Sequence, residues 1–319
     1  MVRFLLKIAL FWILLIGLIY TAAKVASRNA ENKEYHNFNV EENVIITPKN
    51  EHFEFVMLGL SHARNFSRHR NHQRVEKILD RKFINFGKGG GKGNIANQHV
   101  YLKYFLSRGN TTDHIYYVLS MPMFFAERLD ENAFTYQYEK LDPLFFYQVL
   151  TGPDINKGEK LYTYIRSKFD KHWREKYGTW SEKKREKVLE KIDSTAINRG
   201  FKLAYVNGLE FDTFEKNKKL MQETVELAQK NDIEITFIIT PSTFGEWPGH
   251  EHVMDFMDTL HEKYGTEIHD FSRVYLGRKK LFYDHHHLNS DGVVKFTKEH
   301  LKPLIEQEMK ETQAPNPND

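Results

Sequence analysis

Residues 53–62 read FEFVMLGLSH, a short and mostly apolar run that ends in glycine, leucine, serine and histidine. An apolar run of this length, bounded by turn residues, is typical of a buried strand. The residues that follow, at about 64–80, have the spacing of a helix. The sequence therefore predicts a strand, a tight turn that carries Ser61, and a helix.

The same alternation of short apolar runs and helical patterns continues along the chain. Further strands are predicted at 82–86, 114–120, 233–239 and 267–271, and helices at about 94–106, 213–230, 250–264 and 290–311. Short strands that alternate with helices indicate a parallel sheet covered by helices on both faces. Because crossover connections are right-handed, few topologies remain, and we predict an α/β fold, a flavodoxin-like three-layer sandwich.

The composition excludes several classes of protein. Hydrophobic residues make up 40% of the 319-residue chain and aromatic residues 14%, which excludes a disordered or low-complexity protein. Lys and Arg number 46 against 43 Asp and Glu, so no nucleic-acid partner is predicted, because duplex binding usually needs a concentrated basic face. The absence of cysteine excludes disulfides, thiolate zinc sites and a cysteine nucleophile.

The first 28 residues predict a membrane anchor. Residues 8–23 are uncharged and nearly all apolar, and together with residues 4–6 they approach the ~20 residues that span a bilayer core. A cleaved signal peptide is the main alternative, because small residues lie near the end of the run, and a buried helix of a soluble protein is the third. We predict a single-pass protein that contacts the lipid bilayer through residues 4–23, with its C-terminal domain extracytoplasmic.

The rest of the chain divides into a stalk, a domain and a tail. Residues 29–50 are predicted to be a polar stalk with a short strand at 44–47, residues 51–312 the α/β domain, and residues 313–319 a disordered tail. A helical insertion is predicted at about 121–200. Within it, residues 157–191 contain 12 Lys or Arg against 6 Asp or Glu, either as a solvated helical face or as a surface for anionic head groups or an anionic polymer.

Chemistry in such a sheet is expected in the loops that follow its strands. Ser61 lies in the first of these loops, where it is either an exposed nucleophile or only a helix cap. A serine nucleophile needs a base, and Asp284 and His287 are three residues apart on one turn, so they can form an oriented imidazole; the alternatives are an ordinary turn and a surface histidine. His285 and His286 are predicted to face solvent or to pack, and a metal site is a weaker alternative because the HExxH spacing is absent.

The glycine-rich loop at 87–93 does not predict a cofactor. It lacks the P-loop pattern, and although a loose dinucleotide pattern fits at Gly91, Gly93 and Ala96, no acidic residue ends a second strand at the required distance. The loop is therefore either a flexible turn or a segment whose backbone N–H groups join an oxyanion hole.

Together these loops resemble the SGNH, or GDSL-like, hydrolase superfamily over roughly residues 50–310. The resemblance rests on GLS at 59–61, NFGKGG at 85–90 and DHHHLN at 284–289. It implies that Ser61 is the nucleophile, His287 the base and Asp284 its orienting carboxylate, with the amides of Ser61 and Gly90 as oxyanion donors. The chain departs from the pattern at Leu60, where the family usually has Asp, and in lacking the third block, whose Asn is an oxyanion donor. Asn94 or Asn97 could substitute for that Asn.

With its predicted anchor and these departures from the pattern, the chain is similar to the cell-envelope branch of the superfamily. That branch includes the D-alanyl transfer protein of lipoteichoic acid synthesis and the accessory proteins of alginate and peptidoglycan O-acetylation. The resemblance implies an acyl-ester substrate, an envelope polysaccharide or glycopolymer, and a membrane-bound O-acyltransferase as partner. A non-catalytic envelope scaffold and a metal-dependent hydrolase are the alternatives.

Overall fold

The fold is a parallel α/β sandwich, seen here in a computed structural model that describes residues 1–31, 47–89, 93–137, 139–170 and 188–313. One five-stranded sheet has the order β2-β1-β3-β4-β5, and every neighbouring pair is parallel. The strands are β1 (His52–Gly59), β2 (Phe83–Asn85), β3 (Thr111–Leu119), β4 (Glu234–Ile239) and β5 (Glu267–Asp270). This strand order is the flavodoxin-like one, so the predicted fold class is confirmed.

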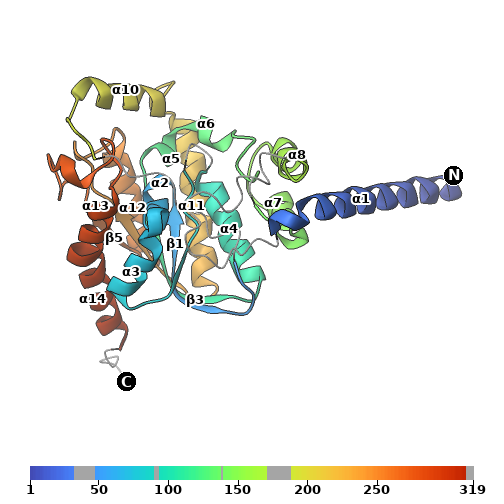
Figure 1. Cartoon of the computed structure of the whole chain (residues 1–319), viewed down its shortest axis with the longest axis horizontal. Coiled ribbons are helices and arrows are strands. Elements are labelled where there is room, and N and C mark those ends of the chain that lie inside the picture. Colours follow the sequence, from blue (N-terminus) through green and yellow to red (C-terminus); the bar gives the residue numbers. More distant parts are fainter. Residues whose placement is uncertain (32–46, 90–92, 138, 171–187, 314–319) are drawn as a thin grey trace.

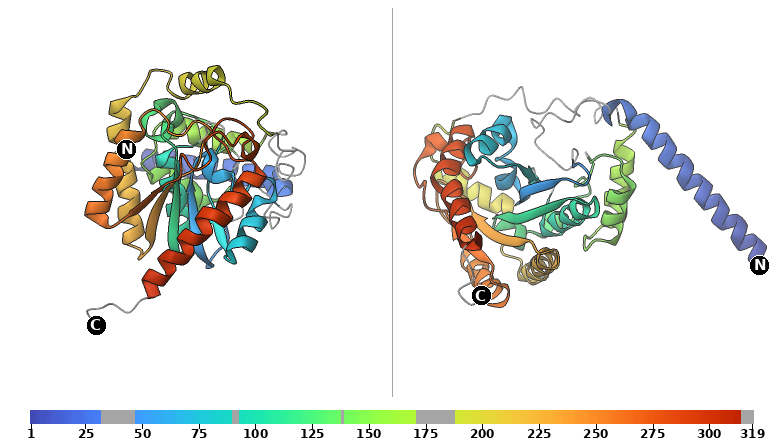
Figure 2. Two further views of the ribbon diagram at one scale, coloured as in Figure 1. Left: turned by 90° about the vertical axis from the view of Figure 1, so that its left-hand side faces the viewer. Right: turned by 90° about the horizontal axis from the view of Figure 1, so that it is seen from below.

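Helices cover both faces of the sheet. The main helices of the domain are α3 (Asn71–Leu79), α4 (Ile95–Ser107), α11 (Phe211–Gln229), α12 (His250–Tyr264), α13 (Ser290–Phe296), the π-helical turn η4 (Thr297–Leu301) and α14 (Lys302–Gln313). Apolar residues of α4, α11 and α12 share one core with the sheet, while those of α3, α13 and α14 share a second core on the other face. The left view of Figure 2 shows the sheet between α12 on one side and α3 and α14 on the other.

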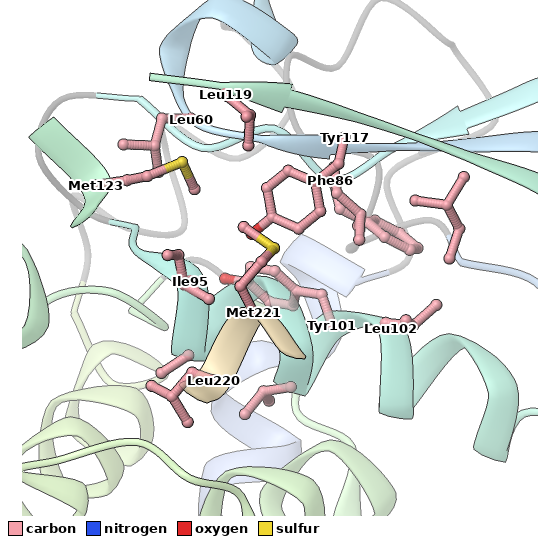
Figure 3. Close-up of a cluster of buried hydrophobic side chains, with 14 of the residues drawn as sticks. Leu60, Phe86, Ile95, Tyr101, Leu102, Tyr117, Leu119, Met123, Leu220 and Met221 are labelled. Atoms are coloured by element: carbon pink, nitrogen blue, oxygen red, sulfur yellow. The ribbon is translucent and has the colours of Figure 1, made fainter. Parts of the chain in front are cut away.

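Strand β1 is buried on both faces, as its apolar sequence predicts. Val56 and Leu58 pack into the core with α4 and α11, part of which Figure 3 shows, and Phe55 and Met57 pack into the opposite core. Burying a side chain of this kind contributes about 1.5–3 kcal/mol to stability. The strand therefore fixes the position of the loop that follows it.

The carboxyl ends of the strands meet at one edge of the sheet. Gly59 of β1 pairs with Val118 of β3, and Ile239 of β4 pairs with both Leu119 of β3 and Asp270 of β5. The loops after β1, β3, β4 and β5 therefore open on the same edge, where ligands bind in open parallel sheets.

The prediction of a single helix at 64–80 is wrong for the first half of that range. The chain instead forms α2 (Ser61–Arg64), a 3-10 turn η2 (Arg68–Arg70) and only then α3. His69 and Arg70 adopt positive φ angles of 50° and 65°, which interrupts the helix. The Asn71 side chain donates to the carbonyl of Asn65 over 2.8 Å, so a side chain competes here for the backbone hydrogen bonds of a helix.

The N-terminal helix α1 (Val2–Glu31) contains a span, Val2–Ala26, that is long and apolar enough to cross a membrane. It projects away from the domain beside the insertion (Figures 1 and 2). Ala23, near its end, is buried against the domain. Whether this helix is retained as an anchor stays a prediction.

The described part of the insertion contains five helices joined by turns and irregular segments. Its helices are α5 (Pro122–Phe125), α6 (Glu127–Asp130), α7 (Pro143–Thr151), α8 (Lys157–Ser167) and α10 (Ser194–Ala204). The middle of the basic segment, residues 171–187, lies outside the described residues, as do most of the predicted short strand at 44–47 and residues 314–319 of the predicted tail. The predicted domain boundaries therefore stay predictions.

Candidate active site

A tight turn at the end of β1 places Ser61 at the carboxyl edge of the sheet. Gly59 has a φ of 135°, and a Cβ atom there would lie 2.4 Å from the carbonyl oxygen of Val118 on the neighbouring strand. Only glycine fits this close approach of two strands. The chain then turns directly into α2, whose first residue is Ser61, and the serine side chain remains partly exposed.

Local hydrogen bonds shape the loop that carries Asp284 and His287. Asp284 Oδ1 accepts hydrogen bonds from the backbone N–H groups of His286 and His287, at 2.9 and 2.8 Å. Asn289 closes the loop: its amide donates to the carbonyl of Lys280, and its oxygen accepts from the N–H of Gly292 as the cap of α13. The loop thus holds Asp284 and His287 in one orientation before any distant residue contacts them.

The structure brings Ser61, His287 and Asp284 into one hydrogen-bonded chain. His287 Nδ1 lies 2.7 Å from Asp284 Oδ2, and His287 Nε2 lies 2.7 Å from Ser61 Oγ. Because an ionised carboxylate only accepts hydrogen bonds, the proton of neutral His287 is on Nδ1. Nε2 is then free to accept the proton of the Ser61 hydroxyl, which is the geometry of an activated serine nucleophile.

Burial and hydrogen bonding set the protonation states of Asp284 and His287. Burial alone would raise the pKa of Asp284, but the hydrogen bond and the positive charge of His287 outweigh it and hold the pKa well below its usual value. Burial lowers the pKa of His287, more than Asp284 raises it. At neutral pH, the geometry therefore pairs an ionised carboxylate with a neutral imidazole, the state that can accept a proton.

Two aromatic rings hold the imidazole of His287. Tyr283 stacks on it with ring centroids 5.2 Å apart, and His62 stacks on it at 4.9 Å. Arg68 donates to the hydroxyl of Tyr283 over 3.2 Å. Sequence reasoning gave no role to Tyr283 or His62; the only signal was their position next to the predicted site residues.

His285 and His286 pack, which was one of the two alternatives for them. His286 contacts the ring of Trp247, with centroids 5.0 Å apart, and the ring of His287 at 4.0 Å. His285 Nε2 accepts a hydrogen bond from the N–H of Asp193 over 3.1 Å. These two histidines join the loop to neighbouring segments rather than extending the hydrogen-bonded chain.

The glycine-rich loop packs directly against the turn that carries Ser61. Asn85 donates to the carbonyl of Ala63 over 2.8 Å, and its oxygen accepts from the N–H of Gly87, also over 2.8 Å. Lys88 forms a buried ion pair with Glu139 of the insertion. Gly90 lies outside the described residues, so its role as oxyanion donor stays a prediction. The Ser61 amide is in the first turn of α2, where backbone N–H groups lack partners within a helix.

Asn94 and Asn97, the possible substitutes for the third-block Asn, both have structural hydrogen-bond partners. Asn94 caps α4, where it and Asn97 form a reciprocal pair of backbone hydrogen bonds. The Asn97 amide also donates to Tyr136 and to Asp154, each over 2.7 Å. Both side chains are completely buried in this structural network, so a role in the oxyanion hole would require them to give up these hydrogen bonds.

We expect Gly87→Ala to destabilise the protein and lower its activity. A Cβ atom at Gly87 would lie 2.3 Å from the backbone nitrogen of Arg64, so the glycine-rich loop or α2 has to move. Overpacking of this kind costs about 1–3 kcal/mol. Thermal unfolding measures the loss, and Gly158→Ala is the control, because nothing lies within 4 Å of the added methyl group. Equal melting temperatures for Gly87→Ala and wild type would contradict the close packing.

Ligand atoms of Asp284, His286 and His287 lie within 4.8 Å of one another, a spacing that could hold a metal ion. Glu246, His250 and Asp270 form a second group with the same property. In the first group, however, both ring nitrogens of His287 already have partners, Asp284 and Ser61. A metal ion bound there would have to replace one of these hydrogen bonds.

Comparisons with known proteins give similarity of structure only. No protein-family model matches the sequence, and no curated protein matches it significantly. The chain is similar to a Bacteroides fragilis protein described as a candidate acylhydrolase, with 11% identity and a TM-score of 0.42 over 88% of this chain and 97% of the other. It is also similar to a GDSL-like lipase of Bacteroides thetaiotaomicron, with 11% identity and a TM-score of 0.40 over 88% and 98% of the two chains. At this level of similarity, the functional proposal depends on the geometry of the site.

Proposed function

We propose that the protein is a serine-dependent acyl-ester hydrolase or O-acyltransferase. The observation that carries this proposal is the hydrogen-bonded chain from Ser61 through His287 to Asp284, with 2.7 Å at each step. These side chains come from two loops 226 residues apart. Packing does not require a serine, a histidine and a carboxylate in this order, whereas nucleophilic catalysis does.

In the proposed mechanism, Ser61 Oγ attacks the carbonyl carbon of the ester while His287 Nε2 takes its proton. The protonated imidazole, stabilised by Asp284, then donates the proton to the leaving alcohol, which leaves an acyl group on Ser61. Water or a second alcohol, activated by His287, releases the acyl group. The first acceptor makes the protein an esterase and the second a transferase.

We further propose that the reaction takes place at the outer face of a membrane, on an envelope glycan or glycopolymer. Helix α1 supports the anchor by its length and composition. The basic sequence of the insertion favours an anionic polymer or head group. A membrane-bound O-acyltransferase is the proposed partner, on the basis of the resemblance in sequence motifs.

An activated serine phosphonate tests the enzyme proposal on the full chain. Mass spectrometry is expected to find one adduct, at Ser61, and none in the Ser61→Ala variant. A non-catalytic scaffold, the alternative favoured by the missing third-block Asn, gives no adduct at Ser61. A chelator distinguishes a metal-dependent hydrolase from a serine hydrolase. It would abolish ester hydrolysis by the first and leave the second active.

The pH dependence of ester hydrolysis follows from His287. The imidazole has to be neutral to accept the serine proton, so kcat/KM falls as the pH drops through the pKa of His287. Burial lowers this pKa below the ordinary 6.5. We therefore expect the acid limb of the profile, measured with p-nitrophenyl acetate, to have its midpoint below pH 6.5. A midpoint above 6.5 would contradict the assigned environment.

A further inference from the structure

A small cavity lies next to the candidate active site, at the carboxyl edge of the sheet. It has a volume of about 10 Å³, room for about one water-sized group. Residues after β1, β3, β4 and β5 line it, most of them polar: His62, Ser120, Thr240, Trp247, His250 and Ser272 among others. Ser61 follows β1, and the cavity residue Ser120 follows β3. These two strands are neighbours, since Gly59 pairs with Val118, so both residues lie at the same edge of the sheet.

Two residues that line this cavity each have a buried polar atom with no hydrogen-bond partner among the described residues. The atoms are Nδ1 of His62, a residue only 7% exposed, and Oγ of Ser272, a residue 2% exposed. Leaving a buried polar group unpaired costs about 1–3 kcal/mol, so native proteins rarely do so without a reason. Two such atoms on residues that line one cavity suggest a group that would complete their hydrogen bonds.

The hydrogen bonding of His62 defines the chemistry of that group. His62 Nε2 lies 3.0 Å from the carbonyl oxygen of His286, which can only accept, so Nε2 carries the proton of the neutral ring. Nδ1 is then a lone-pair acceptor. Burial lowers the pKa of His62 to about 4, which keeps the ring neutral at ordinary pH. The cavity therefore offers an acceptor from His62 and a hydroxyl from Ser272.

The cavity residue His62 contacts the imidazole that would protonate the leaving alcohol. The oxygen of that alcohol has to receive its proton from His287 Nε2. The ring of His62 stacks on the ring of His287 with centroids 4.9 Å apart. We therefore infer that atoms next to the leaving oxygen lie near His62. A hydroxyl group on the neighbouring carbon of the alcohol is small enough for the cavity. It would also supply the hydrogen-bond donor that His62 Nδ1 does not have.

We propose that His62 and Ser272 form a subsite for a hydroxyl group of the alcohol part of the substrate. The substrate class is then an ester of a polyhydroxylated alcohol, such as a sugar, that carries a free hydroxyl next to the esterified oxygen. This inference rests on the proposed function, because it assigns the alcohol side of the same reaction. His62 and Ser272 act as specificity-determining residues.

Two esters that differ by one hydroxyl test this subsite on the full chain. Cyclohexyl acetate and trans-2-hydroxycyclohexyl acetate have the same ring and the same acyl group. We expect wild type to have a kcat/KM roughly 5- to 100-fold higher for the hydroxylated ester, the range of a hydrogen bond to buried polar groups. Equal values in wild type, after correction for the spontaneous rates, overturn the proposal and leave water as the occupant of the cavity.

Variants assign the preference to the two residues. His62→Phe keeps a ring that can stack on His287 but removes both nitrogens, and we expect the ratio of the two kcat/KM values to fall close to one. Ser272→Ala is expected to reduce the ratio, and His62→Asn, which keeps a side-chain oxygen near the place of Nδ1, to restore part of it. Unchanged ratios in His62→Phe and Ser272→Ala overturn the assignment.

A matched control comes from the opposite end of the sheet. Thr266 Oγ1 is also buried without a partner among the described residues, but it lines a different pocket, at the amino end of β5. Thr266→Val therefore removes a comparable hydroxyl far from Ser61 and is expected to leave the ratio unchanged.

Failure of the proposed function gives a different result from failure of the subsite. If wild type hydrolyses neither ester nor p-nitrophenyl acetate, the proposed function fails. The subsite is then tested by binding of trans-cyclohexane-1,2-diol, measured as thermal stabilisation. Stabilisation of wild type that is lost in His62→Phe supports the subsite, and no difference between the two overturns it.

Discussion

Ser61→Ala is expected to lower kcat for p-nitrophenyl acetate by about 10⁴-fold or more. The alanine removes the hydroxyl group that donates a hydrogen bond to His287 Nε2 and serves as the nucleophile. The substitution leaves Gly59, the strand β1 and the hydrogen bond from Asn85 to the Ala63 carbonyl of α2 unchanged. Because the serine side chain is partly exposed, the free energy of unfolding is expected to stay within about 0.5 kcal/mol of the wild-type value.

The control for this variant is Ser107→Ala, which removes a serine hydroxyl from the end of α4. Ser107 Oγ donates to the carbonyl of Tyr104 and has no contact with the candidate site. It is expected to retain wild-type turnover. Equal rates for wild type, Ser61→Ala and Ser107→Ala would show that any hydrolysis comes from elsewhere on the protein and would end the serine mechanism.

Asp284→Asn is expected to lower kcat by about 10⁴-fold while the loop keeps its shape. Two backbone N–H groups point at Asp284 Oδ1, so the asparagine side chain is expected to turn its oxygen toward them. Its NH₂ group then faces His287 Nδ1 and donates to it. The proton of His287 moves to Nε2, and the Ser61 hydroxyl no longer faces a base.

Kinetics and structure together check this result. A neutral-pH assay measures kcat, and a crystal structure of the variant shows whether His287 and Ser61 keep their positions. Asp291→Asn is the control, because Asp291 is an exposed acidic residue in the first turn of α13, a few residues away. Turnover by Asp284→Asn at the wild-type rate would mean that the carboxylate does not control the tautomer of His287.

The sequence predicted those parts of the site that depend on neighbours along the chain. Asp284 and His287 are three residues apart, so one turn brings carboxylate and imidazole together without help from the rest of the fold. The apolar run at 53–58 predicted β1, because a strand buried on both faces consists almost entirely of apolar residues. Asn94 could be expected to start α4, because Asn is a favoured helix cap.

Other features could not be read from the spacing of apolar residues along the chain. The break at His69 and Arg70 arises from backbone and side-chain hydrogen bonds that the helical spacing of apolar residues does not report. The role of His62 depends on its stacking against His287, which lies on a distant segment of the chain. Tyr283 lies on the same loop as His287, but its stacking depends on the conformation of that irregular loop.

The amino-acid sequence by itself determined the alternation of strands and helices, the turn at Ser61 and the pairing of Asp284 with His287, because each depends on interactions within a few residues. Only the tertiary structure decided that Ser61 Oγ lies 2.7 Å from an imidazole 226 residues away. That distance follows from the strand order, which brings the carboxyl end of β1 and the loop before α13 to the same edge of the sheet. The physical reason is that burial of apolar surface selects the strand order, and this selection involves the whole core at once.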